Sequence, residues 1–132
     1  MMIAFWCVFI AALLPYVWTA CAKVGARGYD NNAPRQFADA QQGMRQRANW
    51  AQYNSFEAFP AFAAAVFCAH LMQVEAVWLN GLAVTFVVAR TLYGVTYLLD
   101  LASLRSVVWF IGFGSMVALF LLAGLRYGGV PM

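Results

Sequence analysis

Residues 1–22 read MMIAFWCVFIAALLPYVWTACA and contain no charged side chain. A helix needs roughly 20 consecutive apolar residues to cross a hydrocarbon core about 30 Å thick, and this stretch is long enough. A cleaved secretory signal would have a shorter apolar part and would begin with basic residues. Tyr16 and Trp18 also lie where a signal peptidase needs small side chains. The stretch therefore predicts a membrane-spanning helix.

The composition of the whole chain is typical of a membrane protein. Of its 132 residues, 64% are hydrophobic and 10% are charged, and the mean hydropathy is +0.71. Soluble domains are about half apolar and about a quarter charged, so a soluble domain is excluded. The formal net charge is +3, but the basic residues number only eight and the rest of the chain is apolar. They cannot form a surface that follows phosphates, which excludes a nucleic-acid partner.

Three more apolar segments follow the first, at residues 44–73, 76–99 and 106–125. The segment 23–43 is a polar loop, within which Pro34 disfavours a helical Ala33, so that a helix can begin at Arg35. The turn between the second and third segments is short, as is the polar joint between the third and fourth. The pattern predicts an all-α integral membrane protein, a single domain over 1–132 folded as an up-and-down bundle of four transmembrane helices.

The basic residues predict the orientation of this bundle in the membrane. Seven of the thirteen charged residues lie between Lys23 and Arg47, five of them basic, and Arg105 lies in the polar joint between the third and fourth segments. Lys and Arg concentrate in cytoplasmic loops of membrane proteins. We therefore expect a multi-pass protein whose charged loop faces the cytoplasm and whose two termini face the other side.

Two ionisable residues lie well inside apolar segments. A charge at the centre of a spanning helix costs about 2.5 to 3.5 kcal/mol even on insertion scales, so Glu57 and Arg90 each need a partner or water. Glu57 lies 16 residues before Gln73, about 24 Å along its helix, and Arg90 lies 15 residues after Glu75, about 22 Å along the next one. The two side chains are thus expected at the same depth.

Further polar residues continue both helices toward the charged loop. On the second helix they share one face with i, i+3, i+4 spacing, and on the third helix they do the same. The members are Arg47, Trp50, Asn54, Glu57 and Ala61 on the second helix, and Arg90, Tyr93 and Tyr97 on the third. One interpretation is a neutralised structural pair with hydrogen bonds between helices, the tyrosines being interfacial anchors. The other is a half-wet cleft whose donors suit an anionic amphiphile or a peptide carboxylate.

Metal and disulfide chemistry are not indicated. Cys7, Cys21 and Cys68 all lie in apolar stretches without a C-x-x-C spacing, and His70 has no carboxylate or cysteine at metal-ligand spacing. We expect the cysteines to be packing residues, His70 to be a packing or interfacial side chain, and no metal to be bound.

Two motifs resemble a known family, the membrane-associated proteins in eicosanoid and glutathione metabolism (MAPEG). The stretch WAQYNSFEAFP, residues 50–60, is similar to the R-A-x-x-N-x-x-E-x-x-P motif on the second helix of that family. Arg90, Tyr93 and Tyr97 match its R-x-x-Y-x-x-x-Y on the third helix, and Arg105 resembles the arginine that activates the glutathione thiol in several members. The resemblance covers nearly the whole chain.

The resemblance implies a homotrimer of a bacterial type, located in the inner membrane, that binds glutathione as co-substrate between neighbouring subunits on the cytosolic side. An apolar co-substrate would enter from the membrane lipid. The implied glutathione contacts are Asn54, Glu57, Arg90, Tyr93 and Tyr97, with Arg105 stabilising the thiolate, since a nearby cation lowers the pKa of a thiol. The leading Arg of the first motif is replaced by Trp50, and Arg47, one turn earlier, is the candidate to contact the same anion.

Three functions follow from these patterns. The first is a glutathione-dependent transferase or peroxidase acting on lipophilic electrophiles. The second, suggested by Trp50, is a non-catalytic lipid-binding or scaffold protein of the same fold, because family membership alone does not establish an enzyme. The third is a small proton-coupled exporter, which is disfavoured because the first segment holds no carboxylate.

Overall fold

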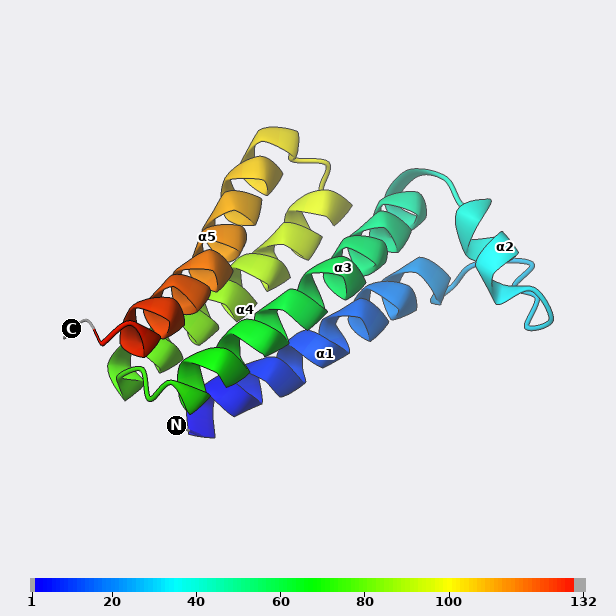
Figure 1. Ribbon diagram of the computed structural model, residues 1–132. Coiled ribbons are helices and arrows are strands. Elements are labelled where there is room, and N and C mark those ends of the chain that lie inside the picture. Colours follow the sequence, from blue (N-terminus) through cyan, green and yellow to red (C-terminus); the bar gives the residue numbers. More distant parts are fainter. Residues whose placement is uncertain (1, 130–132) are drawn as a thin grey trace.

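The computed structural model describes residues 2–129, and every regular element in that part of the chain is a helix. The helices are α1 (Met2–Lys23), α2 (Pro34–Asp39), α3 (Gly43–Leu71), α4 (Ala76–Leu98) and α5 (Ala102–Tyr127). The four long helices run side by side, and the short α2 lies outside them, beside the ends of α1 and α3 (Figure 1). The all-helical prediction is thus confirmed for the described residues.

The chain is an integral membrane protein by the length and hydropathy of its helices. Three of the four expected spans, α1, α4 and α5, are long and apolar enough to cross a membrane. Their outward faces carry large apolar side chains, such as Trp6, Phe110 and Leu121, each more than 60% exposed. α3 has 29 residues, about 44 Å of helix, and is long enough to cross a membrane. Because of its polar residues, its mean hydropathy is lower than that of the other three helices, and it is not among the helices apolar enough to span.

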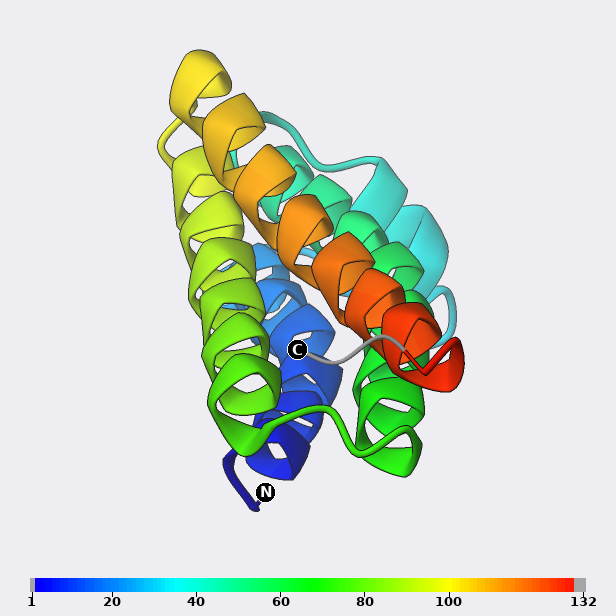
Figure 2. The ribbon, with the colours of Figure 1, turned by 60° about the vertical axis from the view of Figure 1, so that its left-hand side comes forward.

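Small side chains hold the bundle together. Ala4 and Ala11 of α1 and Ala65 and Ala69 of α3 are all buried in one core cluster. Small residues let helix backbones approach closely, which drives association where lipid removes the usual hydrophobic contrast. α3 and α4 both contact α1 and α5, so that α1 and α5 lie on opposite sides of the α3–α4 pair (Figure 2).

The two tight turns at the ends of α3 and α4 have the same geometry. Gln73 (φ 56°) and Asp100 (φ 60°) adopt the left-handed conformation just after the helix. Each turn closes with paired backbone bonds, for example Val74 N to Ala69 O at 2.9 Å and Gln73 N to His70 O at 3.0 Å. This is the Schellman arrangement, which satisfies carbonyls that a helix end leaves free.

Because the second turn is so compact, α5 begins at Ala102, four residues before the start that hydropathy predicted. Residues 102–105 contain no proline or glycine, so the backbone turns helical as soon as the αL residue has passed. Arg105 is therefore a residue of the first turn of α5, and its expected place in a loop is wrong. α3 likewise ends at Leu71, two residues earlier than predicted, because Gln73 is the αL residue.

The polar loop is more ordered than its composition suggests. α2 begins at Pro34, next to the helical start expected at Arg35. Asp39, at the end of α2, accepts hydrogen bonds from Asn49 Nδ2 (3.1 Å) and from the Tyr53 hydroxyl (2.8 Å) of α3. Arg45 Nη1 donates to the carbonyls of Ala22 and Val24, so it fastens α3 to the end of α1.

Candidate functional site

Arg90 is the centre of the polar contacts between α3 and α4. Its side chain is buried, with 3% exposure, and its Nη2 donates to the backbone carbonyl of Asn54 at 3.1 Å and also to the Asn54 side-chain oxygen Oδ1. A guanidinium bonded to two oxygens of one residue is held in a fixed orientation. The cation that the sequence placed inside the membrane thus has its partner on α3, as expected, but that partner is an amide.

Glu57 belongs to the same hydrogen-bond network, but it is connected to Arg90 only through Asn54. Asn54 Nδ2 donates to Glu57 Oε2 at 3.3 Å, while no ion pair within 4.0 Å joins Glu57 to Arg90. Glu57 is exposed on the surface of the single chain. The direct pair that equal depth suggested is therefore wrong, because depth along a helix does not fix which side chain points at the neighbour. Oε1 of Glu57 has no hydrogen-bond donor among the described residues.

Two tyrosines lie between two guanidinium groups. Arg90 Cζ lies 4.4 Å from the ring centre of Tyr93, and Arg105 Cζ lies 4.3 Å from that of Tyr97. The rings meet edge to face, with their centroids 5.3 Å apart. The two distances from guanidinium to ring centre are within the range of a cation–π attraction. The third-helix motif and Arg105 of α5 are thus brought together, as the sequence predicted for the end of the bundle near the charged loop.

Three adjoining cavities surround this group. A cavity of about 420 Å³ is lined by Trp50, Tyr53, Asn54, Glu57, Tyr93 and Tyr97. A second, of about 210 Å³ and mainly apolar, shares Asn54 and Glu57 with it and reaches Trp109 and Phe113 of α5. A third, of about 140 Å³, is lined by Tyr93, Arg105 and Trp109 among others. The larger cavity, which the polar groups of Asn54, Glu57 and the tyrosines line, therefore adjoins an apolar one at Asn54 and Glu57.

Arg47 is not brought into this group. Its Nη2 donates to the carbonyl of Leu98 at 3.2 Å, and its Nη1 lies 3.9 Å from Oδ2 of Asp100. These contacts place the guanidinium at the carboxyl end of α4, where a cation is favourable. Trp50, which replaces the motif's arginine, lines the larger cavity, with its ring centroid 6.2 Å from that of Tyr97.

Two glycines that support the site were not recognised as such from the sequence. A Cβ on Gly94 would lie 2.0 Å from Cζ2 of Trp18, so the buried indole of α1 fits against α4 only because that side chain is missing. A Cβ on Gly112 of α5 would lie 3.3 Å from Cδ of Arg90. A glycine in the middle of an apolar helix was the available signal. The side chain of Trp18 is 4% exposed.

Among the described residues, no group of three or more His, Cys, Asp or Glu side chains could hold a metal ion. The site offers two cations, a carboxylate with an open oxygen, an amide and two phenols. Three of these residues, Asn54, Glu57 and Arg90, line the apolar cavity. Such a set can bind a zwitterionic ligand that carries more than one carboxylate, with an apolar molecule next to it.

Comparison with known proteins identifies the family. No curated protein and no solved structure matches the chain. The model of the MAPEG family matches residues 3–125, nearly the whole chain. The match extends from α1 into the last turns of α5 and includes each residue of the candidate site. This chain is therefore a member of the MAPEG family, as the two motifs had suggested.

Proposed function

We propose that this protein is a membrane-bound, glutathione-dependent transferase or peroxidase that acts on lipophilic electrophiles. The observation that supports this best is the arrangement of Arg90 and Arg105 on the faces of Tyr93 and Tyr97, with Glu57 nearby and open. Glutathione carries two carboxylates, one ammonium group and one thiol. A site for it therefore needs cations to bind the carboxylates and a carboxylate to bind the ammonium group.

The ligand's groups can be assigned to residues by chemistry. Glu57 Oε1, which has no donor among the described residues, would accept from the ammonium group. Arg90 would face a carboxylate, with Asn54 and the tyrosine hydroxyls as further hydrogen-bonding groups. Arg105 makes no hydrogen bond to a side chain among the described residues and would stabilise the thiolate. A cation next to a thiol lowers its pKa and so raises the fraction of nucleophile at neutral pH.

The transferase step follows from this arrangement. The thiolate sulfur attacks the electrophilic carbon of an apolar molecule, a carbon–sulfur bond forms, and the leaving group departs with the electron pair of the broken bond. The apolar cavity beside Asn54, lined by Trp109 and Phe113, would hold that molecule out of water. Phe113 is also exposed on the outer surface of the chain, which supports entry of the electrophile from the lipid side.

We also propose that α3 crosses the membrane and that the protein forms homotrimers. α3 packs along α1 and α4, two helices long and apolar enough to span, and it connects to them at opposite ends. The exposed carboxylate of Glu57 would be costly against acyl chains, so burial against a neighbouring subunit is favoured. The basic loop favours a cytoplasmic location for α2, with both termini on the other side. The inner membrane of a bacterium is the location that the resemblance of the motifs implies.

Trp50 supports a second candidate, a non-catalytic lipid-binding or scaffold protein of the same fold. The site then lacks the arginine that the family motif carries at this position, and Arg47, the nearest cation on α3, is bound to the end of α4. Without turnover, the apolar cavity would serve binding alone.

Glutathione binding tests the choice between these candidates. Calorimetry on the purified protein and ultraviolet difference absorbance of the bound thiolate should both be positive for the wild type. Arg105→Gln should lose the thiolate signal, whereas the matched control Arg126→Gln, at the other end of α5, should keep it. Wild-type protein that neither binds glutathione nor forms thiolate would reject the enzyme, and lipid binding unchanged in Arg105→Gln would then favour the second candidate.

A further inference from the structure

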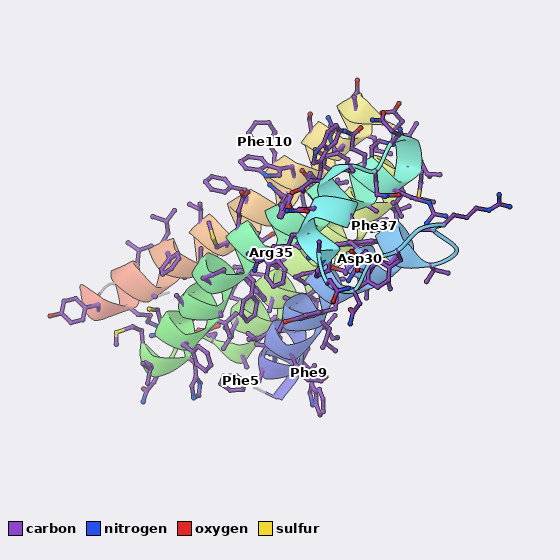
Figure 3. The ribbon with its side chains drawn as sticks, turned by 90° about the vertical axis from the view of Figure 1, so that its right-hand side faces the viewer. Phe5, Phe9, Asp30, Arg35, Phe37 and Phe110 are labelled. Carbon is purple, nitrogen blue, oxygen red and sulfur yellow. The ribbon has the colours of Figure 1, made fainter. Side chains whose placement is uncertain are left out.

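A second groove lies between the end of α1, α2 and the first turns of α3, and Tyr53 separates it from the larger cavity of the candidate site by lining both. It has a volume of about 470 Å³ and is lined by residues that include Thr19, Lys23, Arg35, Asn49, Tyr53 and Phe56. Figure 3 looks onto this side, with α2 in front of α3 and Arg35 labelled. We propose that this groove binds the phosphate headgroup of an anionic phospholipid, independently of any glutathione chemistry.

The charges that line the groove fit an anion. Lys23 and Arg35 both contribute to the wall, and Arg35 has neither a hydrogen bond nor an ion pair among residues 2–129. Lys23 makes one hydrogen bond, to the Tyr29 hydroxyl at 3.3 Å, so its ammonium keeps two donors. The carboxylate of Asp39 accepts hydrogen bonds from Asn49 and Tyr53, and that of Asp30 accepts from Asn32. The described residues that line the groove thus include two cations and no carboxylate.

The carboxyl end of α1 lies at this groove, but its carbonyl groups are not free to repel a bound anion. Helix carboxyl ends carry free carbonyls and a partial negative charge. At this end, however, the carbonyl of Ala22 accepts from Arg45, that of Lys23 accepts from Ala26 N, and that of Ala20 accepts from Val24 N. Because these carbonyls are satisfied within the protein, the two cations dominate the groove.

The groove's depth points to a lipid. α1 has 22 residues, about 33 Å of helix, which matches the hydrocarbon thickness, so its last residue Lys23 lies at the membrane surface. Below the cations the wall becomes apolar at Phe56, whose ring packs edge to face with that of Tyr16, 5.7 Å away. Both rings are exposed on the outer surface of the chain. A headgroup among the cations can therefore continue into acyl chains along Tyr16 and Phe56, as in other basic pockets at membrane surfaces.

Native mass spectrometry of the detergent-solubilised protein tests this proposal. The probes are phosphatidylglycerol and phosphatidylcholine with identical acyl chains. Phosphatidylglycerol should bind preferentially to the wild type. A cation near an anionic headgroup contributes about 1 kcal/mol, so Arg35→Gln should weaken this binding about fivefold, and Lys23→Gln with Arg35→Gln roughly thirtyfold. Arg35 has no protein partner to lose, so its single variant should remain folded.

Arg27→Gln is the matched control, because Arg27 is an exposed cation of the same loop that does not line the groove. It should bind phosphatidylglycerol as the wild type does. An equal loss in this control would show attraction to the net charge of the loop and would overturn the proposal. Displacement of the lipid by millimolar inorganic phosphate would identify a site for free phosphate and would also overturn it. So would equal binding of the two lipids, or unchanged binding in the double variant.

Discussion

Arg90 on α4 reaches across to α3 and donates to both oxygens of Asn54, while Glu57, one turn along α3, binds only the amide nitrogen of the same asparagine. The Asn54 side chain therefore links the buried cation to the exposed carboxylate by hydrogen bonds, an arrangement that we call the Asn54 relay. An amide can do this because it accepts at one atom and donates at another. The arrangement leaves Glu57 free to meet a second cation, whether from a ligand or from a neighbouring subunit.

This relay predicts unequal losses of stability. Asn54→Ala should lower the free energy of unfolding by about 1 to 3 kcal/mol, because it leaves the Arg90 guanidinium buried without its side-chain acceptor. Glu57→Gln should change it by no more than about 0.5 kcal/mol in the dissociated subunit, because Glu57 is exposed there and makes no ion pair with Arg90. Unfolding in detergent, followed by circular dichroism, measures both.

Double variants with Arg90→Met extend this test. The coupling of Arg90 with Asn54 should exceed its coupling with Glu57. A larger coupling with Glu57 would mean that the two charges pair directly, and the relay would be wrong.

The level at which α3 and α4 meet could be predicted from the sequence, but not the partner of Arg90. Counting residues from the tight turn placed Glu57 and Arg90 at the same depth, because the rise per residue is fixed. The direction of each side chain around the helix axis depends on how the helices pack, which the count does not include. Glu57 was therefore expected where Asn54 lies.

Other features could not be predicted from the sequence, for related reasons. Hydropathy located the spans but misplaced the start of α5, because helix formation at 102–105 depends on backbone propensity and not on apolarity. The contact of Arg47 with the end of α4 depends on the shape of the turn at Asp100, a non-glycine αL residue. The fit of Trp18 against Gly94 joins residues far apart in the sequence. None of these is visible in a local pattern.

Arg47 should affect stability and not ligand binding. Arg47→Met removes the hydrogen bond to the Leu98 carbonyl and the contact with Asp100, so unfolding should become easier by about 1 to 2 kcal/mol. Glutathione affinity by calorimetry should stay at the wild-type value, since the side chain lines none of the three cavities of the site. Weaker glutathione binding at unchanged stability would instead make Arg47 a ligand contact.

Gly94 should be intolerant of any side chain. Gly94→Ala would drive a methyl group into the Trp18 indole, and overpacking of this kind costs about 1 to 3 kcal/mol. Gly81→Ala is the matched control in the same helix, because nothing lies within 4 Å of its added methyl group. It should be neutral or slightly stabilising. Combining Gly94→Ala with Trp18→Leu should recover part of the loss, and an equal response of the two glycines would refute the proposed fit.

The ring of Tyr97, and not its hydroxyl, should position Arg105. In Tyr97→Phe the ring stays beneath the guanidinium, so the thiolate fraction of bound glutathione at neutral pH should match the wild type. In Tyr97→Leu the cation–π attraction, about 0.5 to 1 kcal/mol, no longer holds the Arg105 guanidinium in place. If that free energy is lost from the thiolate form, the ionisation constant of the bound thiol falls roughly two- to fivefold. Titration of the thiolate absorbance against pH at saturating glutathione separates this effect from weaker binding. Equal changes in the two variants would assign the role to the hydroxyl and leave Arg105 positioned by something other than the ring.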